Sequence, residues 1–399
     1  MSYPFDSAQA YLTSPANSPI EMPLELILSI IEAACLGSRE KERLRILRSC
    51  SLVCRLWSTV SQQLLFSRIV LGSQCAFDAF AAVLDNSTIH GQFLRYSVTS
   101  IRVVFNSGQQ SCLGREKFQQ ILDICPNVRE LSVSLFGPSR KSSPSDASPC
   151  VEPLKATTPA SLQTSRFLTS LHINSWQDED ESYLLHLLSL SPRLTTLSLG
   201  GKSPPSSFPP ATAIPFALSE LRLSYQTSPS VSFVKWLLSN SMETLSAVTF
   251  CRDPWPDVLE YLTTYHGHLL QSLSLRSPIH MSVLNRCSQL NEFRTSSPIT
   301  PSCSSILKQL PPTLRKLSLA IERDTPLSSV IEYVKCNERL EELAIQLRDD
   351  GSRNILLSPL RIACAFQGVL LHIPSHSRGM QQPPVRGLSP KCPLLTDYL

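Results

Sequence analysis

Three groups of residues in this sequence have types and spacings that suggest chemistry. The first, Gly200-Gly201-Lys202-Ser203, echoes the end of a phosphate-binding loop. Such a loop has its first glycine where this chain has Thr196, and it continues into a helix where this chain has Pro204 and Pro205. Because proline removes a backbone donor and blocks the first turns of a helix, we do not expect this stretch to hold a phosphate.

The other two groups are an acidic run and the histidines. The run Asp178-Glu179-Asp180-Glu181 suggests a divalent metal, but we expect it at the start of a helix, where negative charge meets the helix dipole. None of the eight histidines stands beside cysteines or acids at zinc-binding spacing, and no Gly-x-Ser-x-Gly sequence occurs. The sequence therefore predicts no catalytic residue, no cofactor site, no metal site and no enzymatic activity.

With no catalytic or metal site predicted, the remaining function for these residues is recognition of another protein. Charged residues recur between the apolar positions of short predicted strands, where they face solvent side by side: Glu130, His172, Asn174, Glu220, Arg222, Arg276, Glu292, Arg294, Lys316, Glu342 and Gln346. We predict Arg222, Arg276, Arg294 and Lys316 as target-binding residues, because guanidinium groups in particular make bidentate contacts with carboxylate or phosphate. Ordinary solvated charges are the alternative interpretation, and the mixed sign of the surface argues against nucleic acid as a partner.

A repeated pattern positions these charges. An apolar-x-x-apolar-x-apolar motif occurs ten times, at Val98-Ile101-Val103, Val128-Leu131-Val133, Leu168-Leu171-Ile173, Leu194-Leu197-Leu199, Leu218-Leu221-Leu223, Leu245-Val248-Phe250, Leu270-Leu273-Leu275, Leu290-Phe293-Thr295, Leu314-Leu317-Leu319 and Leu340-Leu343-Ile345. From Leu168 onward, successive motifs begin 20 to 27 residues apart. The last two apolar positions of each motif point the same way on a strand, so stacked repeats bury a continuous core. An ordinary α/β protein with leucine-rich strands does not account for this period.

The segments between several motifs show helical spacing of apolar residues. Examples are Phe118 to Cys125, Phe233 to Leu237, Val258 to Leu262 and Val330 to Val334. A further helix is expected from Ala76 to Leu84, with Phe77, Phe80 and Leu84 on one face. The stretch from Leu356 to Ile373 is expected to close the array, as a strand pair or a helix.

These features resemble leucine-rich repeats. The family commonly places Asn or Cys eight residues after the first leucine, whereas the corresponding residues here are Phe136, Trp176, Lys202, Gln226, Asp253, Pro278, Pro298, Glu322 and Arg348. The resemblance therefore implies an irregular solenoid, a horseshoe of parallel strands and helices. We expect it to span residues 72–373, with flexible Ser/Pro-rich inserts near 138–165 and 200–215.

The stretch from Pro23 to Leu71 differs from the repeats. It predicts three short helices, the first with Leu24, Ile27, Leu28 and Ile31 at i, i+3, i+4 and i+7. They offer more apolar side chain than a core of about 50 residues encloses, so the stretch needs a partner surface. An N-terminal helical cap of a larger solenoid is the alternative.

The same stretch resembles a fungal-type F-box. The resemblance lies in Pro23-Leu24-Glu25-Leu26-Ile27, Ile30-Ile31, Cys50 to Trp57 and Leu65-Phe66. Two departures are Met22 in place of leucine and a long, charged linker from Ala34 to Arg43. Together, the two resemblances imply an α/β fold for the chain. We expect an N-terminal three-helix F-box at residues 20–71, followed by the irregular solenoid.

The F-box resemblance also implies partners. Members of that family bind a Skp-type adaptor, and through it a cullin and a RING subunit, while the rest of the chain binds a target protein for ubiquitin transfer. The residues that the resemblance assigns to the adaptor are Pro23, Leu24, Leu26, Ile27, Ile30, Ile31, Leu52, Val53, Cys54, Trp57 and Leu65. Two other functions stay open: a leucine-rich-repeat scaffold that forms no ligase, and a regulator of a small GTPase.

Composition limits where the protein works. A net charge of +4 on 399 residues is too small to argue for nucleic acid or an anionic membrane. The 13 cysteines lack paired spacing, which is typical of reduced thiols. No apolar run reaches about 18 residues, and the N-terminus lacks the features of a signal peptide, so we expect a cytoplasmic or nuclear protein. Residues 1–19 are expected to be a disordered N-terminus and residues 374–399 a C-terminal tail.

Overall fold

The computed structural model describes residues 22–106, 113, 117–136, 167–176, 184–185, 187–188, 191–204, 213–277, 284–299, 307, 310–348 and 351–373. They fall into two compact units, a three-helix unit that ends at Ser67 and a repeat unit that begins at Arg68. The predicted N-terminal disorder at 1–19, the insert at 138–165, the acidic run at 178–181 and the tail at 374–399 lie outside the described residues. So do positions 205–212 of the second insert.

The three-helix unit consists of α1 (Leu24–Cys35), α2 (Glu40–Ser51) and α3 (Arg55–Phe66). Its core is made of Ile27, Ile31, Leu47 and Val60, and six half-buried side chains pack around them: Leu28, Cys35, Cys50, Trp57, Leu64 and Leu65. Gly37 has φ +75 between α1 and α2, a left-handed conformation that glycine adopts without steric cost. The helices end before Leu71, the predicted boundary of this stretch, because Arg68–Leu71 pairs with the sheet instead.

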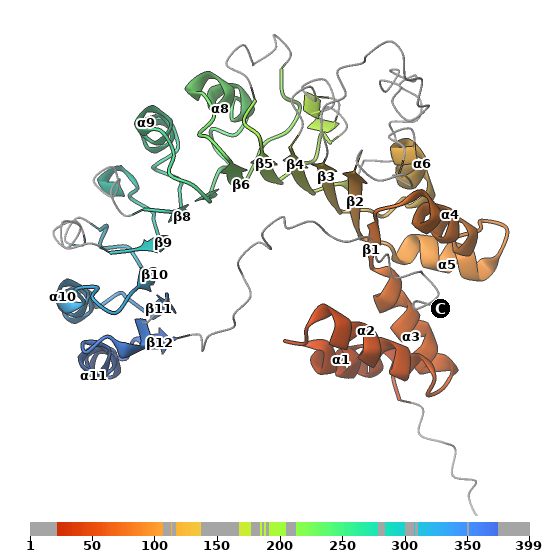
Figure 1. Ribbon diagram of the computed structural model, residues 1–399, viewed down its shortest axis with the longest axis horizontal. Coiled ribbons are helices and arrows are strands. Elements are labelled where there is room, and N and C mark those ends of the chain that lie inside the picture. The colour runs from red at the N-terminus through yellow and green to blue at the C-terminus, as the bar shows by residue number, and fades with distance from the viewer. Residues whose placement is uncertain are drawn as a thin grey trace, which may run out of the picture. The chain divides into compact units, whose positions relative to one another are not determined.

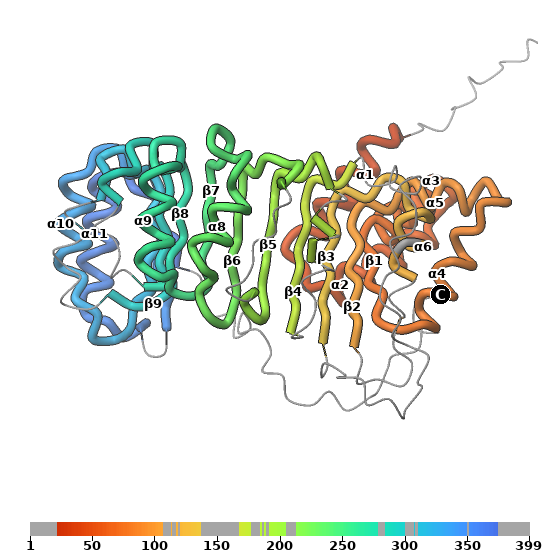
Figure 2. Tube along the Cα trace, turned by 90° about the horizontal axis from the view of Figure 1, so that it is seen from above, coloured from red at the N-terminus to blue at the C-terminus, as the bar shows by residue number. Residues whose placement is uncertain are grey.

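The repeat unit is built on one sheet of twelve parallel strands that follow one another in sequence order. The strands are β1 (Arg68–Leu71), β2 (Ser100–Asn106), β3 (Glu130–Phe136), β4 (Ser170–Ser175), β5 (Thr196–Gly201), β6 (Glu220–Tyr225), β7 (Ala247–Phe250), β8 (Ser272–Leu275), β9 (Glu292–Pro298), β10 (Lys316–Ile321), β11 (Glu342–Leu347) and β12 (Leu370–His372). Figure 2 shows β1 to β9 in this order along the unit. The chain thus has a mixed α/β fold with an all-parallel sheet.

The ten predicted motifs coincide with β2 to β11 and supply the core of the repeat unit. None of their thirty apolar-pattern positions is more than 5% exposed. Neighbouring strands align the same motif position, as when Leu197 pairs with Leu171 on one side and Leu221 on the other. The strand alternation predicted from the sequence is therefore confirmed. Within the described sheet, the register shifts between Ser318 and Ala320, where β10 pairs with β9.

Helices connect the strands of the repeat unit. They are α4 (Gln74–Val83), α5 (Ile89–Ser97), α6 (Lys117–Ile124), α8 (Val231–Leu237), α9 (Pro256–Tyr265), α10 (Ser328–Cys336) and α11 (Leu357–Gln367), with a short 3-10 helix at Gly351–Arg353. In the repeat unit α6, α8, α9, α10 and α11 lie on the outer side of the curved sheet (Figure 1). The helical spacings predicted between the motifs are confirmed, and the closing segment is α11 followed by β12.

Backbone hydrogen bonds connect successive repeats just before each strand. The amide of Thr169 donates to the carbonyl of Arg129 at 2.9 Å, that of Thr195 to Thr169 at 2.9 Å, and that of Ser219 to Thr195 at 2.8 Å. The Thr195 and Ser219 hydroxyls donate to the same carbonyls at 3.2 and 3.1 Å. This ladder stabilises the strand starts without the Asn or Cys side chains that leucine-rich repeats commonly use.

The predicted insert at 200–215 begins too early, because Gly200 and Gly201 form the end of β5. A Cβ on Gly200 would lie 2.3 Å from the Ser224 hydroxyl and 2.5 Å from the Asn174 side chain. Gly201 has φ +92, and a Cβ there would overlap the backbone of Ser175. Glycine is needed at Gly201 because of its left-handed backbone and the adjacent Ser175 backbone of β4, so the pair ends a strand and does not start a loop.

Candidate recognition surfaces

Several large apolar side chains of the three-helix unit point into solvent. Leu52 and Val53, in the connection between α2 and α3, are 86% and 63% exposed. Leu24, Leu26, Ile30 and Leu56 are each more than 40% exposed. We call these six residues the apolar surface. Large apolar side chains exposed in this number within one small unit are unfavourable in water and indicate a site that another protein covers.

Helix α1 is apolar on two sides. Ile27 and Ile31 are buried in the core of the unit, whereas Leu26 and Ile30 are exposed. Residues at i and i+4 share a helix face, so each pair forms its own short stripe. Apolar residues on two faces are typical of a helix that is buried on both of them. In the described residues only one of these two stripes is covered.

The structure separates the predicted adaptor-binding residues into two sets. Seven lie on the outside: Pro23, Leu24, Leu26, Ile30, Leu52, Val53 and Cys54. The other four, Ile27, Ile31, Trp57 and Leu65, belong to or pack against the core of the unit. These four hold the helices together and do not form an open surface. Leu56 is exposed as well, although the sequence reasoning did not select it.

The inner face of the repeat unit carries its charges in two parallel rows. One row follows the first inward-facing position of each strand and holds Glu130, Glu220, Glu292, Lys316 and Glu342. We call it the glutamate row. The next inward-facing position forms the arginine row, which from β2 to β12 reads Arg102, Ser132, His172, Ser198, Arg222, Thr249, Ser274, Arg294, Ser318, Ala344 and His372. The arginine row contains no carboxylate.

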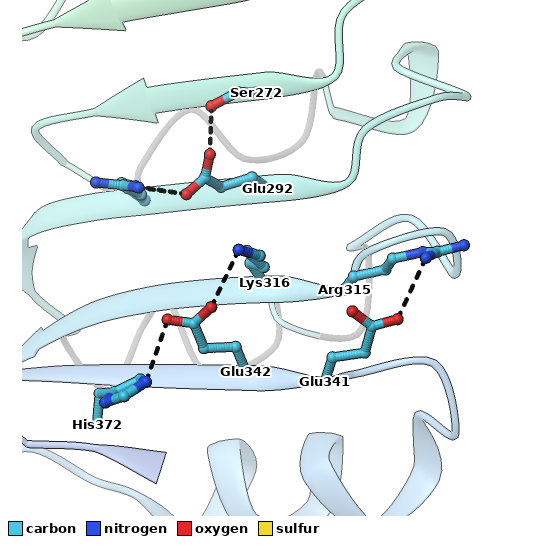
Figure 3. A network of polar contacts seen from close by, with 8 residues as sticks. Ser272, Glu292, Arg315, Lys316, Glu341, Glu342 and His372 are labelled. Carbon is cyan, nitrogen blue, oxygen red and sulfur yellow. Dashed lines mark hydrogen bonds and ion pairs between the residues drawn. The ribbon is translucent and has the colours of Figure 1, made fainter. Parts of the chain in front are cut away.

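At the C-terminal end of the sheet the two rows neutralise each other. A hollow of about 340 Å³ is lined there by both rows, and its ion pairs are drawn in Figure 3. Glu342 forms an ion pair with Lys316 at 3.2 Å and lies 3.7 Å from the His372 ring nitrogen. Glu292 accepts from Arg294 at 2.8 Å and from the Ser272 hydroxyl at 2.9 Å.

The pKa of Glu292 reflects this environment. Partial burial acts to raise the pKa, but hydrogen bonds from Arg294 and Ser272, together with the charges of Arg294 and Lys316, hold it below its ordinary value. The carboxylate therefore stays ionised and engaged with its own neighbours. A ligand entering the hollow has to compete with these internal pairs.

At the N-terminal end the arginine row is open. Arg102 and Arg222 are exposed, and neither forms an ion pair or hydrogen bond with any residue that the structure describes. Between them His172 lies 3.6 Å from Glu130 and 3.2 Å from the Ser170 hydroxyl. Partial burial lowers the pKa of His172, the Glu130 carboxylate opposes that shift, and Arg222 and Arg102 add to it. His172 is thus largely neutral at pH 7.

The structure also separates the predicted target-binding residues. Arg222 is free for a partner, Arg294 and Lys316 are held by internal ion pairs, and Arg276 is exposed immediately after β8. Sequence reasoning missed Arg102 and His372. A signal for Arg102 was present, because it stands between Ile101 and Val103 just as Arg222 stands between Leu221 and Leu223.

The described residues contain no group of three or more His, Cys, Asp or Glu side chains placed to hold a metal ion. Burial raises the pKa of Cys125 to about 12 and that of Cys287 to about 11, so these core thiols stay protonated. None of the described helices is long and apolar enough to cross a membrane.

No model of a known protein family matches the chain, and neither does any curated protein.

Proposed function

We propose that this chain is the substrate-recognition subunit of a Skp–cullin–F-box ubiquitin ligase. The three-helix unit binds the Skp-type adaptor, and the inner face of the repeat unit binds the target protein. The chain performs no covalent chemistry itself. It raises the local concentration of a tethered target to about the millimolar range, which favours ubiquitin transfer by the other subunits.

One observation carries the proposal, the apolar surface of the three-helix unit. Five of its six residues, Leu24, Leu26, Ile30, Leu52 and Val53, are positions that the F-box resemblance assigns to the adaptor. Among the described residues, the core of this unit contains four fully buried hydrophobic side chains. An element with so small a core and so many exposed apolar residues gains much of its stability from a partner.

The test uses a double variant of two exposed residues, Leu52→Ala with Val53→Ala. Because both side chains point into solvent, their loss should leave the helices folded, unlike loss of the half-buried Trp57. We expect the free energy of binding to a purified Skp-type adaptor to weaken by about 2–4 kcal/mol, as for central anchors of an interface. Isothermal titration calorimetry and co-purification measure the change.

A matched control is Ile355→Ala, because Ile355 is 88% exposed but belongs to the repeat unit. It should bind the adaptor as the unmodified chain does. Circular dichroism of all variants checks that the helices are intact. Adaptor binding that survives the double variant unchanged, or no adaptor binding by the unmodified chain, rules the proposal out and leaves a non-ligase scaffold as the better description.

A further inference from the structure

The two rows on the inner face have a geometry that a particular ligand would match. Within one strand, the two inward-facing positions are two residues apart, about 6.6 Å at the rise of a parallel strand. This is also the scale on which an extended peptide places side chains to its left and right. A peptide that lies across the strands between the rows presents alternate residues to the glutamate row and to the arginine row.

The spacing along the rows sets the pattern of charges. Arg102 on β2 and Arg222 on β6 are four strands apart, about 19 Å at a strand spacing of about 4.8 Å. Six residues of an extended peptide cover about 20 Å. Glu130 on β3 and Glu220 on β6 are three strands apart, about 14 Å, and four extended residues cover about 13 Å.

Combining the two distances gives a single pattern. We propose that the inner face of β2 to β6 binds an extended peptide segment with acidic residues at its first and seventh positions and basic residues at its second and sixth. The acidic side chains meet Arg102 and Arg222, and the basic ones meet Glu130 and Glu220. The inference rests on the proposed function only in taking the inner face as the target-binding surface.

The state of the charges favours this part of the sheet over the C-terminal hollow. Arg102 and Arg222 have no ion-pair partner among the described residues, so a ligand carboxylate there breaks no ion pair within that part of the chain. Arg294 and Lys316 already hold Glu292 and Glu342, so a ligand there breaks existing pairs. Between the two free arginines, the middle of the arginine row offers only Ser132, His172 and Ser198, which suits small polar residues at the centre of the peptide.

The pattern also explains why the surface is not simply an anion site. Arg102 and Arg222 are balanced by Glu130 and Glu220, and His172 is largely neutral at pH 7 because burial lowers its pKa. The patch therefore has little net charge and gives little long-range attraction to a uniformly acidic peptide. Recognition depends on the arrangement of opposite charges, which contributes more to specificity than to affinity.

The experiment measures fluorescence polarisation of a labelled peptide, Glu-Lys-Ser-Gly-Ser-Lys-Glu, with the full chain. Its comparison peptide, Lys-Glu-Ser-Gly-Ser-Glu-Lys, has the same composition and net charge with every charge exchanged. We expect saturable binding of the first peptide and at least fivefold weaker binding of the second. Equal binding of both peptides, or saturable binding of neither, overturns the proposal.

A charge-exchange pair tests the register directly. Arg222→Glu should raise the Kd of the first peptide about tenfold, and exchanging the last glutamate of the peptide for lysine should restore most of the loss. Arg222→Gln should raise the Kd about fivefold. The control Arg361→Gln removes an exposed arginine of α11, on the outer side of the sheet, and should change nothing. Failure of the exchange to rescue binding excludes this register.

The peptide assay needs no adaptor, so its result tests the charge pattern separately from the proposed ligase function. Adaptor binding without peptide binding refutes only the charge pattern. Peptide binding without adaptor binding refutes only the ligase assignment. A phosphoserine peptide that binds more tightly than the glutamate peptide, with the same dependence on Arg222, keeps the register and assigns the acidic positions to phosphates.

Discussion

The two units of this chain differ in how they bury their large apolar side chains. In the repeat unit, every position of the ten repeated motifs is buried, and charged side chains face solvent in two rows on the inner face. In the three-helix unit, four hydrophobic residues form the core, while leucines and a valine of the same size stand in water. The repeat unit completes its core by stacking on itself. Within the described residues of the three-helix unit, nothing covers the outer stripe of Leu26 and Ile30.

This difference shows where each unit gets its stability. Each repeat contacts the next, so the apolar area buried per residue stays high along the array. A helical unit of about 45 residues buries too little area for large stability on its own. The exposed leucines of the three-helix unit therefore add little to its stability in the free chain, whereas the buried leucines of the repeat unit stabilise the free chain.

The largest effect is expected in the core of the repeat unit. Phe293→Ala removes a fully buried ring from β9 and should lower the free energy of unfolding by about 3–5 kcal/mol. The matched control is Phe366→Ala on α11, because Phe366 is 86% exposed and its loss should cost about 0.5 kcal/mol or less. Urea unfolding followed by circular dichroism measures both. Similar losses for the two variants would mean that the array is not a single packed core.

A smaller absolute effect, but a sharper contrast, is expected in the three-helix unit. Leu47→Ala should cost about 2–4 kcal/mol, because Leu47 lies fully buried between the helices. Leu52→Ala, with the same chemical change at an exposed position, should leave stability almost unchanged. Native-state hydrogen exchange of the α1, α2 and α3 amides distinguishes them. If Leu52→Ala also loses amide protection, its side chain is part of the core and not of an open surface.

Sequence patterns predicted the parts of the fold that repeat. The ten motifs located β2 to β11 because one buried face recurs at a near-constant period. The end strand β1 was missed, since Arg68–Leu71 has only four residues and no motif of its own. Helix α5 was missed because Gly91, a poor helix former, interrupts its apolar spacing. The glycine is required there, since a Cβ would overlap the carbonyl of Asp85.

The candidate surfaces were only partly predictable, for a different reason. Helical spacing grouped Leu24 with Ile27 and Ile31, but only packing decides that Ile27 and Ile31 face the core while Leu24 stays exposed. In the sheet, Arg222 and Arg294 occupy the same repeat position, yet Arg294 has Glu292 within hydrogen-bond reach and Arg222 has no such partner among the described residues. Side-chain pairing depends on rotamers and neighbours that a repeat pattern does not contain.

The smallest expected effect is a loss of stability at acidic pH, which should occur in the repeat unit and not in the three-helix unit. The ring of His266, after α9, is fully buried and packs edge-on against Tyr261. Burial, with the nearby His268, lowers the pKa of His266 below its ordinary value of about 6.5. The unfolded chain therefore binds more protons than the folded chain between the lowered pKa and about 6.5, so the free energy of unfolding falls as the pH drops through that window.

The three-helix unit has no histidine, because the first one in the chain is His90. Lowering the pH from 7.5 to 5.0 should thus reduce amide protection in the repeat unit around α9 and leave that of α1 to α3 nearly unchanged. His266→Phe should remove most of this pH dependence, whereas His268→Gln, at an exposed position, should keep most of it. If acid reduced amide protection equally in both units, the stabilities of the two units would be coupled. The three-helix unit would then be stabilised by the rest of its own chain, and its exposed leucines would not indicate an outside partner.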